Sequence, residues 1–486
     1  MSLILCPGAR NYFWTASIII AGCLAILTSC RWATIADLGK EDHITFTKTT
    51  AMAAMKKDFP RDRFHEGKKL HGKGLTVEEC RQIALTNNLN FQTAKLDELI
   101  KASLSHGEWA RMLPHAIVSA KFDEGDNIVY SDLMGDSYWA NYYERSAWHF
   151  FLEGRWSPTD AALAYYSAKN ADNRIVQSHY ETVRVSQKIV ESVEVSFFRL
   201  LSLQACLPEA NRLVSIREQI TKDMGDLLRD KLAAMVDYHK AKHAQNKARS
   251  ILSQLTADAQ RQRNLLLSTM GFLQDSAAGG SRFDIQGELR EPHVIQIPAD
   301  VELEALRNRP EAYRAGVKHF ESVNDYKRSV VKNFPRVTLF WRYLDDRYNH
   351  PYDKNRQQAG ILLYFDVVDW LTNFADSCAA SRDTVKTEKE VSAIALAIGS
   401  QARMAVLKYL WLLEQVKIKG DSLADSYSLL EVAKRRASND DLDKLAESEA
   451  RAEMILEKIE WQRAVGESNA GFAELRSAMG TNLKPF

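Results

Sequence analysis

Two long stretches of the chain hold almost no proline, and this scarcity limits the folds open to it. Only Pro208 occurs between Thr159 and Glu291, and no proline occurs from Tyr352 to Lys484. Both stretches are rich in residues that favour helices, whereas proline breaks a helix interior. We therefore predict two very long helices, the first of them interrupted at Pro208, each followed by a helix that returns beside it.

These helices are too long for a compact domain. About 70 residues separate Asp160 from the turn expected near Lys231, and at a rise of 1.5 Å per residue they span on the order of 100 Å. One chain cannot cover the apolar stripes of such helices on all sides. We expect the helices to pack laterally against further copies of the chain and to form a tube.

The sequence repeats itself in two halves. At an offset of 221 residues, Pro114 aligns with Pro335. Further along the chain the offset becomes 209, and Ser268–Gly271 aligns with Ser477–Gly480. Matching residues occur in the same order in both parts of the chain, at an offset of 221 before the strands and 209 after them, which indicates an internal duplication. Each half predicts a short helix, a second helix, two strands, a very long helix and a returning helix.

Four short segments alternate between apolar and polar residues with the period of a β-strand. In the second segment, Phe150 and Leu152 fall on one face and Glu153 and Arg155 on the other. Alternation with aromatic ends is typical of strands that cross a membrane, although a half-buried sheet of a soluble protein has a similar pattern. The predicted strands lie near residues 115–123, 147–156, 335–344 and 358–366.

If these strands form a membrane barrel, their polar face lines its lumen. Alternation alone assigns this face, and it predicts a mildly basic interior. The candidate lumen residues are Lys121, Glu153, Arg155, Arg336 and Arg342.

The first thirty residues predict an export signal. Residues 13–27 are mostly apolar, which is too short a run to span a bilayer comfortably but suits a secretory signal. Directly after it, Leu27-Thr28-Ser29-Cys30 resembles the bacterial lipobox, which implies cleavage before Cys30 and lipidation of its thiol. Arg31 in place of aspartate favours the outer membrane over retention in the inner one. An ordinary signal peptide with a chance cysteine is the alternative.

Other function classes find little support. A net charge of +1 provides no argument for nucleic-acid binding. The chain has no Walker A, H-E-x-x-H or G-x-S-x-G motif, so we expect neither an enzyme nor a cofactor. His65 and His71 flank a lysine-containing segment that reads as a solvated linker, and we expect no metal site. The remaining thiols, those of Cys80, Cys206 and Cys378, are expected to be packed as small apolar groups.

Several motifs resemble those of the TolC-type outer-membrane factors. Gly74–Leu89 is similar to the opening motif of that family, and Leu303–Glu311 resembles its second copy. Leu-Pro and Phe-Pro pairs precede the first strand of each half, and a W-x-x-x-D pattern follows the first hairpin. The chain departs from the family in lacking a Y-x-x-G motif near the distal turn at 435–440. The resemblance covers residues from about 75 to 480.

The resemblance implies a fold and a function. The fold is mainly α with a small β part: long coiled-coil helices form an α-barrel, and four strands per protomer join a trimeric 12-stranded transmembrane β-barrel. The function is that of a passive efflux or secretion duct in the outer membrane, which works as a homotrimer with a periplasmic adaptor protein and an inner-membrane transporter. The alternative is a periplasmic coiled-coil lipoprotein that tethers the envelope, which does not explain two equivalent strand pairs.

On this interpretation the chain divides into six parts. They are a lipoprotein signal peptide (1–29), an N-terminal periplasmic segment (30–74), a first repeat (75–274), a linker (275–297), a second repeat (298–480) and a C-terminal tail (481–486).

Charged residues at the distal turns are candidates for a periplasmic gate. Repeated around a constriction, carboxylates would form acidic rings, and arginines could pair with them across helices. These residues could equally be solvated helix ends, where acids also offset a helix dipole. The gate candidates are Asp230, Asp237, Arg435, Asp440, Asp441, Asp443 and Glu449.

Overall fold

The structure is a computed structural model. The chain divides into two units, and all residues that the structure describes belong to the second of them. The first unit comprises Met1–Lys69 and the second Leu70–Phe486. The structure describes residues 74–124, 146–230, 234–272, 284–292, 300–347, 355–436 and 441–483. Cys30 and Asp440 lie outside these residues.

Each half of the described chain contains the same succession of elements. The first half consists of β1 (Gly74–Leu75), α4 (Val77–Asn87), α5 (Leu89–Ala110), β2 (His115–Glu124), β3 (Ser146–Trp156), α6 (Pro158–Arg229) and α7 (Met235–Thr269). The second consists of β4 (Asp284–Ile285), α8 (Val301–Asn308), α9 (Pro310–Val331), β5 (Arg336–Arg347), β6 (Asn355–Tyr364), α10 (Val367–Arg436) and α11 (Asp441–Ala478). The predicted mainly helical fold with four longer strands is confirmed.

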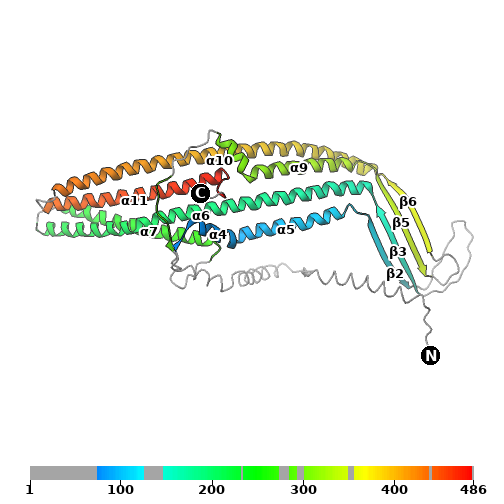
Figure 1. Cartoon of the computed structure of the whole chain (residues 1–486), viewed down its shortest axis with the longest axis horizontal. Helices are drawn as coiled ribbons and strands as arrows, with labels where there is room; N and C mark the ends of the chain where they lie inside the picture. The colour runs from blue at the N-terminus through cyan, green and yellow to red at the C-terminus, as the bar shows by residue number, and fades with distance from the viewer. Residues whose placement is uncertain are drawn as a thin grey trace, which may run out of the picture. The chain divides into compact units, whose positions relative to one another are not determined.

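The two longest helices organise the others. Near the strands, α5 and α9 pack beside α6, and α9 also packs against α10. In the distal part, α7 and α11 flank α6, and α11 also packs against α10. Figure 1 shows the four strands at one end of α6 and α10 and the first residues of α7 and α11 at the other. With 72 residues, α6 is about 110 Å long.

The four longer strands form one antiparallel sheet in the order β2-β3-β5-β6. The two hairpins meet where β3 pairs with β5, and Glu153 stands opposite Arg342 in this register. Within the described residues, β2 and β6 each pair on one side only. The sheet therefore has two open edges in a single protomer.

Two glycines make the internal duplication visible in the backbone. Gly271 and Gly480 follow α7 and α11 with φ values of 82° and 73°. A Cβ at either position would lie 2.7 Å from a carbonyl oxygen, that of Asn87 or Asn308. These two asparagines are 221 residues apart and the glycines 209, which are the two offsets of the repeat. The same turn closes against the same helix in each half.

An ion pair that joins the repeat's short helix to its long helix has opposite polarity in the two halves. In the first half Arg81 of α4 pairs with Glu194 of α6, and both side chains are buried. At the equivalent positions, Glu302 of α8 pairs with Arg403 of α10, and both are much more exposed. Burial raises the pKa of the Glu194 carboxyl, although the charge of Arg81 opposes the shift. Both halves thus have an ion pair at this place, but the arginine is on the short helix in the first half and on the long helix in the second.

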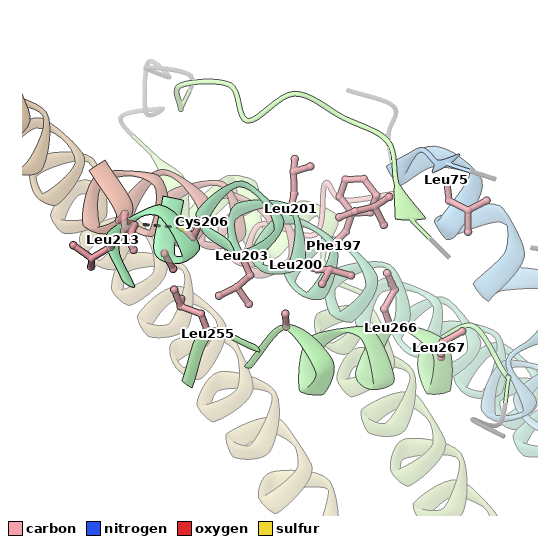
Figure 2. Close-up of a cluster of buried hydrophobic side chains, with 14 of the residues drawn as sticks. Leu75, Phe197, Leu200, Leu201, Leu203, Cys206, Leu213, Leu255, Leu266 and Leu267 are labelled. Atoms are coloured by element: carbon pink, nitrogen blue, oxygen red, sulfur yellow. Dashed lines mark hydrogen bonds between the residues drawn. The ribbon is translucent and has the colours of Figure 1, made fainter. Parts of the chain in front are cut away.

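The distal helices share an apolar core. Figure 2 shows Leu200 and Leu203 of α6 together with Leu255 and Leu266 of α7 in this cluster, all of them buried. Ile455 and Ile459 of α11 and Leu75 of β1 belong to the same cluster. Its apolar area makes it the main source of stability in this part of the fold.

Near the strands, hydrogen bonds between small polar side chains replace this core. Asn170 of α6 donates to Asp325 of α9 at 2.8 Å and accepts from Asn324 at 3.0 Å. Ser322 of α9 lies 2.7 Å from Thr387 of α10, hydroxyl oxygen to hydroxyl oxygen. Because the direction of such bonds matters, they fix the alignment of neighbouring helices more than they add to stability.

Two expectations are wrong. Pro208 does not interrupt the first long helix, because α6 runs unbroken through it. The buried Cys206 and Ala210 on either side show that tertiary packing holds the helix there. Cys80 and Cys206 are buried as expected, whereas Cys378 is exposed on α10.

We predict that Gly271→Ala destabilises the protein by about 1–3 kcal/mol, because alanine is strained at positive φ and its Cβ would meet the Asn87 carbonyl. The matched control is Gly316→Ala in the interior of α9, where a Cβ meets nothing within 4 Å. It should leave stability unchanged or raise it by about 0.5–1 kcal/mol. Thermal unfolding of the detergent-solubilised protein, followed by circular dichroism, measures both. Equal effects of the two substitutions would contradict the prediction.

Candidate functional site

The sheet has one apolar face and one charged face. Residues opposite each other in the register share a face, so Ile117, Glu153, Arg342 and Gln358 lie in one row across all four strands. The neighbouring residue on each strand lies on the other face. This assignment rests on the pairing of the four strands and no longer on alternation alone.

The apolar face is exposed in the protomer. A soluble sheet would bury such a face against a second layer. Here large apolar side chains from every strand remain accessible: Val118, Phe150, Leu152, Trp156, Leu339, Trp341, Ile361 and Leu363. Together they make an exposed apolar surface of the kind that marks contact with a membrane or with another chain.

The charged face is centred on Glu153. Its carboxylate is 2.8 Å from Arg155 Nη2 on the same strand and 3.3 Å from Arg342 Nε on β5. Glu153 is 2% exposed, whereas both guanidinium groups remain partly accessible to solvent. Three residues that the sequence predicts to line the lumen therefore form one contact cluster, which we call the Glu153 cluster.

An aromatic ring on the same face supports this cluster. Arg342 Cζ lies 5.0 Å from the centroid of the Phe340 ring, a cation–π distance. Phe340 in turn lies over Gly360 of β6, where a Cβ would be only 2.8 Å from the ring. Sequence reasoning missed both residues. A glycine inside a strand was the signal that could have indicated a close approach.

The other two lumen candidates lie apart from the cluster. Arg336 pairs with Asp160 in the first turn of α6 at 2.8 Å, a partner that sequence reasoning did not identify. Lys121 lies in β2 opposite His149. Since His149 is four residues from Glu153 on β3, the register puts position 121 on the same face as Glu153. All five candidates thus fall on one face of the sheet by register.

The gate candidates lie at the distal ends of the helices. Asp230 caps the C-terminus of α6 and is exposed, and Glu449 is exposed on α11. Asp237 pairs with Lys240 at 3.2 Å, and Arg435 pairs with Glu431 at 3.6 Å. Asp441 and Asp443 lie in the first turn of α11.

In the described residues, both of these ion pairs are local. Each joins residues three or four positions apart on one helix.

Within the ranges that the structure describes, no group of three or more His, Cys, Asp or Glu side chains is placed to hold a metal ion.

Comparison with solved structures identifies the fold. The outer-membrane channel OprN matches with a TM-score of 0.70 at 15% identity, over 84% of this chain and 91% of OprN. The outer membrane protein VceC from Vibrio cholerae matches with a TM-score of 0.67 at 14% identity, over 83% of this chain and 96% of VceC. The CmeC outer membrane channel of Campylobacter jejuni matches with a TM-score of 0.68 at 11% identity, over 84% of this chain and 86% of CmeC.

The chain therefore has the fold of these outer-membrane channels, as the resemblance to TolC-type factors led us to expect. No protein-family model matches the sequence, and a search of curated proteins finds no match either. At such low identity the similarity establishes the fold, and the function has to be argued from the chain's own residues.

We predict that Arg435→Ala changes the apparent free energy of unfolding by less than about 1 kcal/mol, because its ion pair with Glu431 is exposed. By contrast, Glu194→Gln removes the buried carboxylate that faces Arg81 and leaves Arg81 with its ion pair to Glu78, so it should cost about 1–3 kcal/mol. Chemical unfolding in detergent measures both variants. A loss of several kcal/mol in the arginine variant would contradict the prediction.

Proposed function

We propose that this protein is a passive duct through the outer membrane, which conducts solutes delivered by an inner-membrane transporter. The observation that carries the proposal is the four-stranded sheet, with its exposed apolar face, its charged face and its two open edges. In hydrocarbon, unpaired backbone groups at an open edge are too costly to persist. A closed barrel made from several copies provides partners for both edges and places the charged face around a lumen.

The exposed side of α10 supports lateral assembly of copies. By length and composition alone α10 could cross a membrane, yet only 11% of its most apolar stretch is buried. Trp411 on α10 is 59% exposed, whereas Ser202, its equivalent on α6, is 4% exposed and lies against Gly466 of α11. In the protomer, α11 covers α6. We propose that α7 of a second copy, the equivalent of α11, covers α10 in the same way.

A groove on α7 fits this arrangement. It is lined by Ala257, Gln260, Arg261, Asn264, Leu265 and Ser268. Ser268 corresponds to Ser477 of α11, whose hydroxyl donates to Glu191 of α6 at 2.6 Å. Ala257 corresponds to Gly466, which lies against Ser202 of α6 so closely that a Cβ there would collide with it. Because Ala257 has a Cβ, α7 must lie somewhat farther from the long helix of a second copy than α11 lies from α6. Residues that line the α7 groove thus occupy positions equivalent to those by which α11 contacts α6.

The number of copies comes from the resemblance to the TolC-type family. Three protomers with four strands each give a 12-stranded barrel, which is wide enough for solute passage. The same resemblance supplies the partners, a periplasmic adaptor protein and an inner-membrane transporter, which would meet the duct at its distal turns. A tethering lipoprotein is the weaker alternative, since it requires neither the exposed apolar face nor the open edges.

We predict that cysteines at Trp411 and Ala257 form a disulfide between copies. These positions are equivalent to Ser202 and Gly466, which touch within the protomer. The background carries Cys378→Ser, because that thiol is exposed while Cys80 and Cys206 are buried. Oxidised outer-membrane fractions should show covalent dimers and trimers on non-reducing gels.

The matched control for this pair is Trp411→Cys with Arg249→Cys. Position 249 is eight residues from 257, about 12 Å along α7, and is out of disulfide reach. Equal cross-linking of the two pairs, or a monomer that stays soluble without detergent, would contradict the proposed assembly.

We further propose that residues 1–29 are removed and that lipid is attached to Cys30. Cys30→Ala should abolish incorporation of labelled palmitate if lipid is attached to that thiol. Ile20-Ala21-Gly22-Cys23 also places an apolar residue and two small ones before a cysteine, so Cys23→Ala is the companion variant and should leave the labelling unchanged. Heat-modifiable trimers on gels would show whether the Cys30→Ala variant still assembles. Labelling that persists in the Cys30→Ala variant would refute the anchor.

A further inference from the structure

We propose that the Glu153 cluster makes the duct prefer anionic solutes. This inference rests on the proposed duct and names the class of solute that its barrel favours. The cluster holds two guanidinium groups and one carboxylate, a net charge of +1 on the charged face of each protomer. In a closed assembly of three copies, equivalent clusters lie at one level around the lumen.

The burial of the three groups gives a passing solute a cationic surface. Glu153 is 2% exposed, whereas the side chains of Arg155 and Arg342 are 47% and 36% exposed. The carboxylate lies beneath the two guanidinium groups, and its negative charge is directed into them. A solute in the lumen therefore meets two positive groups and almost none of the carboxylate that orients them.

The contacts of the cluster fix these positive groups in place. Arg155 approaches one carboxylate oxygen of Glu153 through Nε at 3.0 Å and Nη2 at 2.8 Å. Arg342 is held between the carboxylate and the Phe340 ring, and Phe340 is itself seated over Gly360. Charges that are fixed before a solute arrives act on it without the cost of ordering two long side chains.

The nearest described neighbours on this face do not cancel the charge. Ile117 and Gln358, at the two ends of the Glu153 row, are uncharged. Thr338 and Gly360 are uncharged as well. Arg336, closer to the helices, is paired with Asp160. The Glu153 cluster is thus the unbalanced charge in the part of this face whose side chains the structure describes.

The range of this charge depends on ionic strength. The screening length is about 3 Å at 1 M salt, about 10 Å at 0.1 M and about 30 Å at 0.01 M. At low salt the field of the cluster reaches across a lumen of barrel dimensions, and at high salt it is confined to the wall. A preference for anions that rises as salt falls is therefore the signature of a fixed cationic ring.

The test is a planar lipid bilayer that contains the purified full-length protein, with a potassium chloride gradient across it. The reversal potential gives the permeability ratio of chloride to potassium. We expect Arg155→Gln and Arg342→Gln each to lower this ratio by about twofold or more in dilute salt, with a smaller effect at 1 M.

Glu153→Gln is the matched control, because it changes the same cluster in the opposite direction. Removal of the carboxylate raises the local charge from +1 to +2, so the permeability ratio should rise above that of the unmodified protein. General damage to the barrel would move all three variants in one direction. Acidic residues at the distal turns also influence the permeability ratio, but they are the same in every variant, so differences between variants do not arise from them. Heat-modifiable trimers on gels check that each variant assembles.

The outcomes separate this inference from the proposed function. Channels whose permeability ratio is the same in all four proteins, or moves in the same direction in all three variants, overturn the anion ring and leave the duct intact. Absence of any conductance overturns the duct itself, and the anion ring with it.

Discussion

A sheet that enters hydrocarbon has to pair the backbone of its outermost strands, and the architecture of this protein depends on that requirement. The open edges of β2 and β6 leave a row of donors and acceptors without partners in one protomer. Each unpaired group in lipid costs several kcal/mol, so over a ten-residue strand the penalty far exceeds the net stability of a domain. Joining β6 of one copy to β2 of the next removes the penalty. In the proposed assembly, α10 of the first copy would lie beside α5 and α7 of the second, so one mode of assembly would cover both the strand edges and the exposed face of α10.

The two ends of the helical part are held together by different forces. Leucines and isoleucines pack the distal helices, whereas hydrogen bonds among Ser, Thr and Asn side chains align the helices near the sheet. The apolar core supplies stability without strict geometry, and the polar contacts supply geometry with little net stability. The polar contacts lie where helices continue into strands, and there an error in alignment would be passed on to the register of the sheet.

Much of this fold can be predicted from sequence, because its elements are long and strongly patterned. Proline scarcity located α6 and α10, and the alternation of apolar and polar residues located the strands. The failures were of two kinds. Pro208 was overestimated, because helix propensity ignores the helices that pack on both sides of α6. The arrangement around Glu153 was missed, because it depends on the pairing of β3 with β5, and those strands come from different halves of the chain. A pattern within one strand shows which face a residue is on, but not which residue stands opposite it.

The duplicated halves have the same succession of elements and opposite charge at one ion pair, so the two halves are not interchangeable. A ring of identical repeats could close with any half beside any other. Here Arg81 and Glu194 are buried, whereas Glu302 and Arg403 are much more exposed. If α4 packed on α10, Arg81 would face Arg403, and if α8 packed on α6, Glu302 would face Glu194. Repulsion between like charges therefore disfavours a chain in which a short helix packs on the long helix of the wrong half.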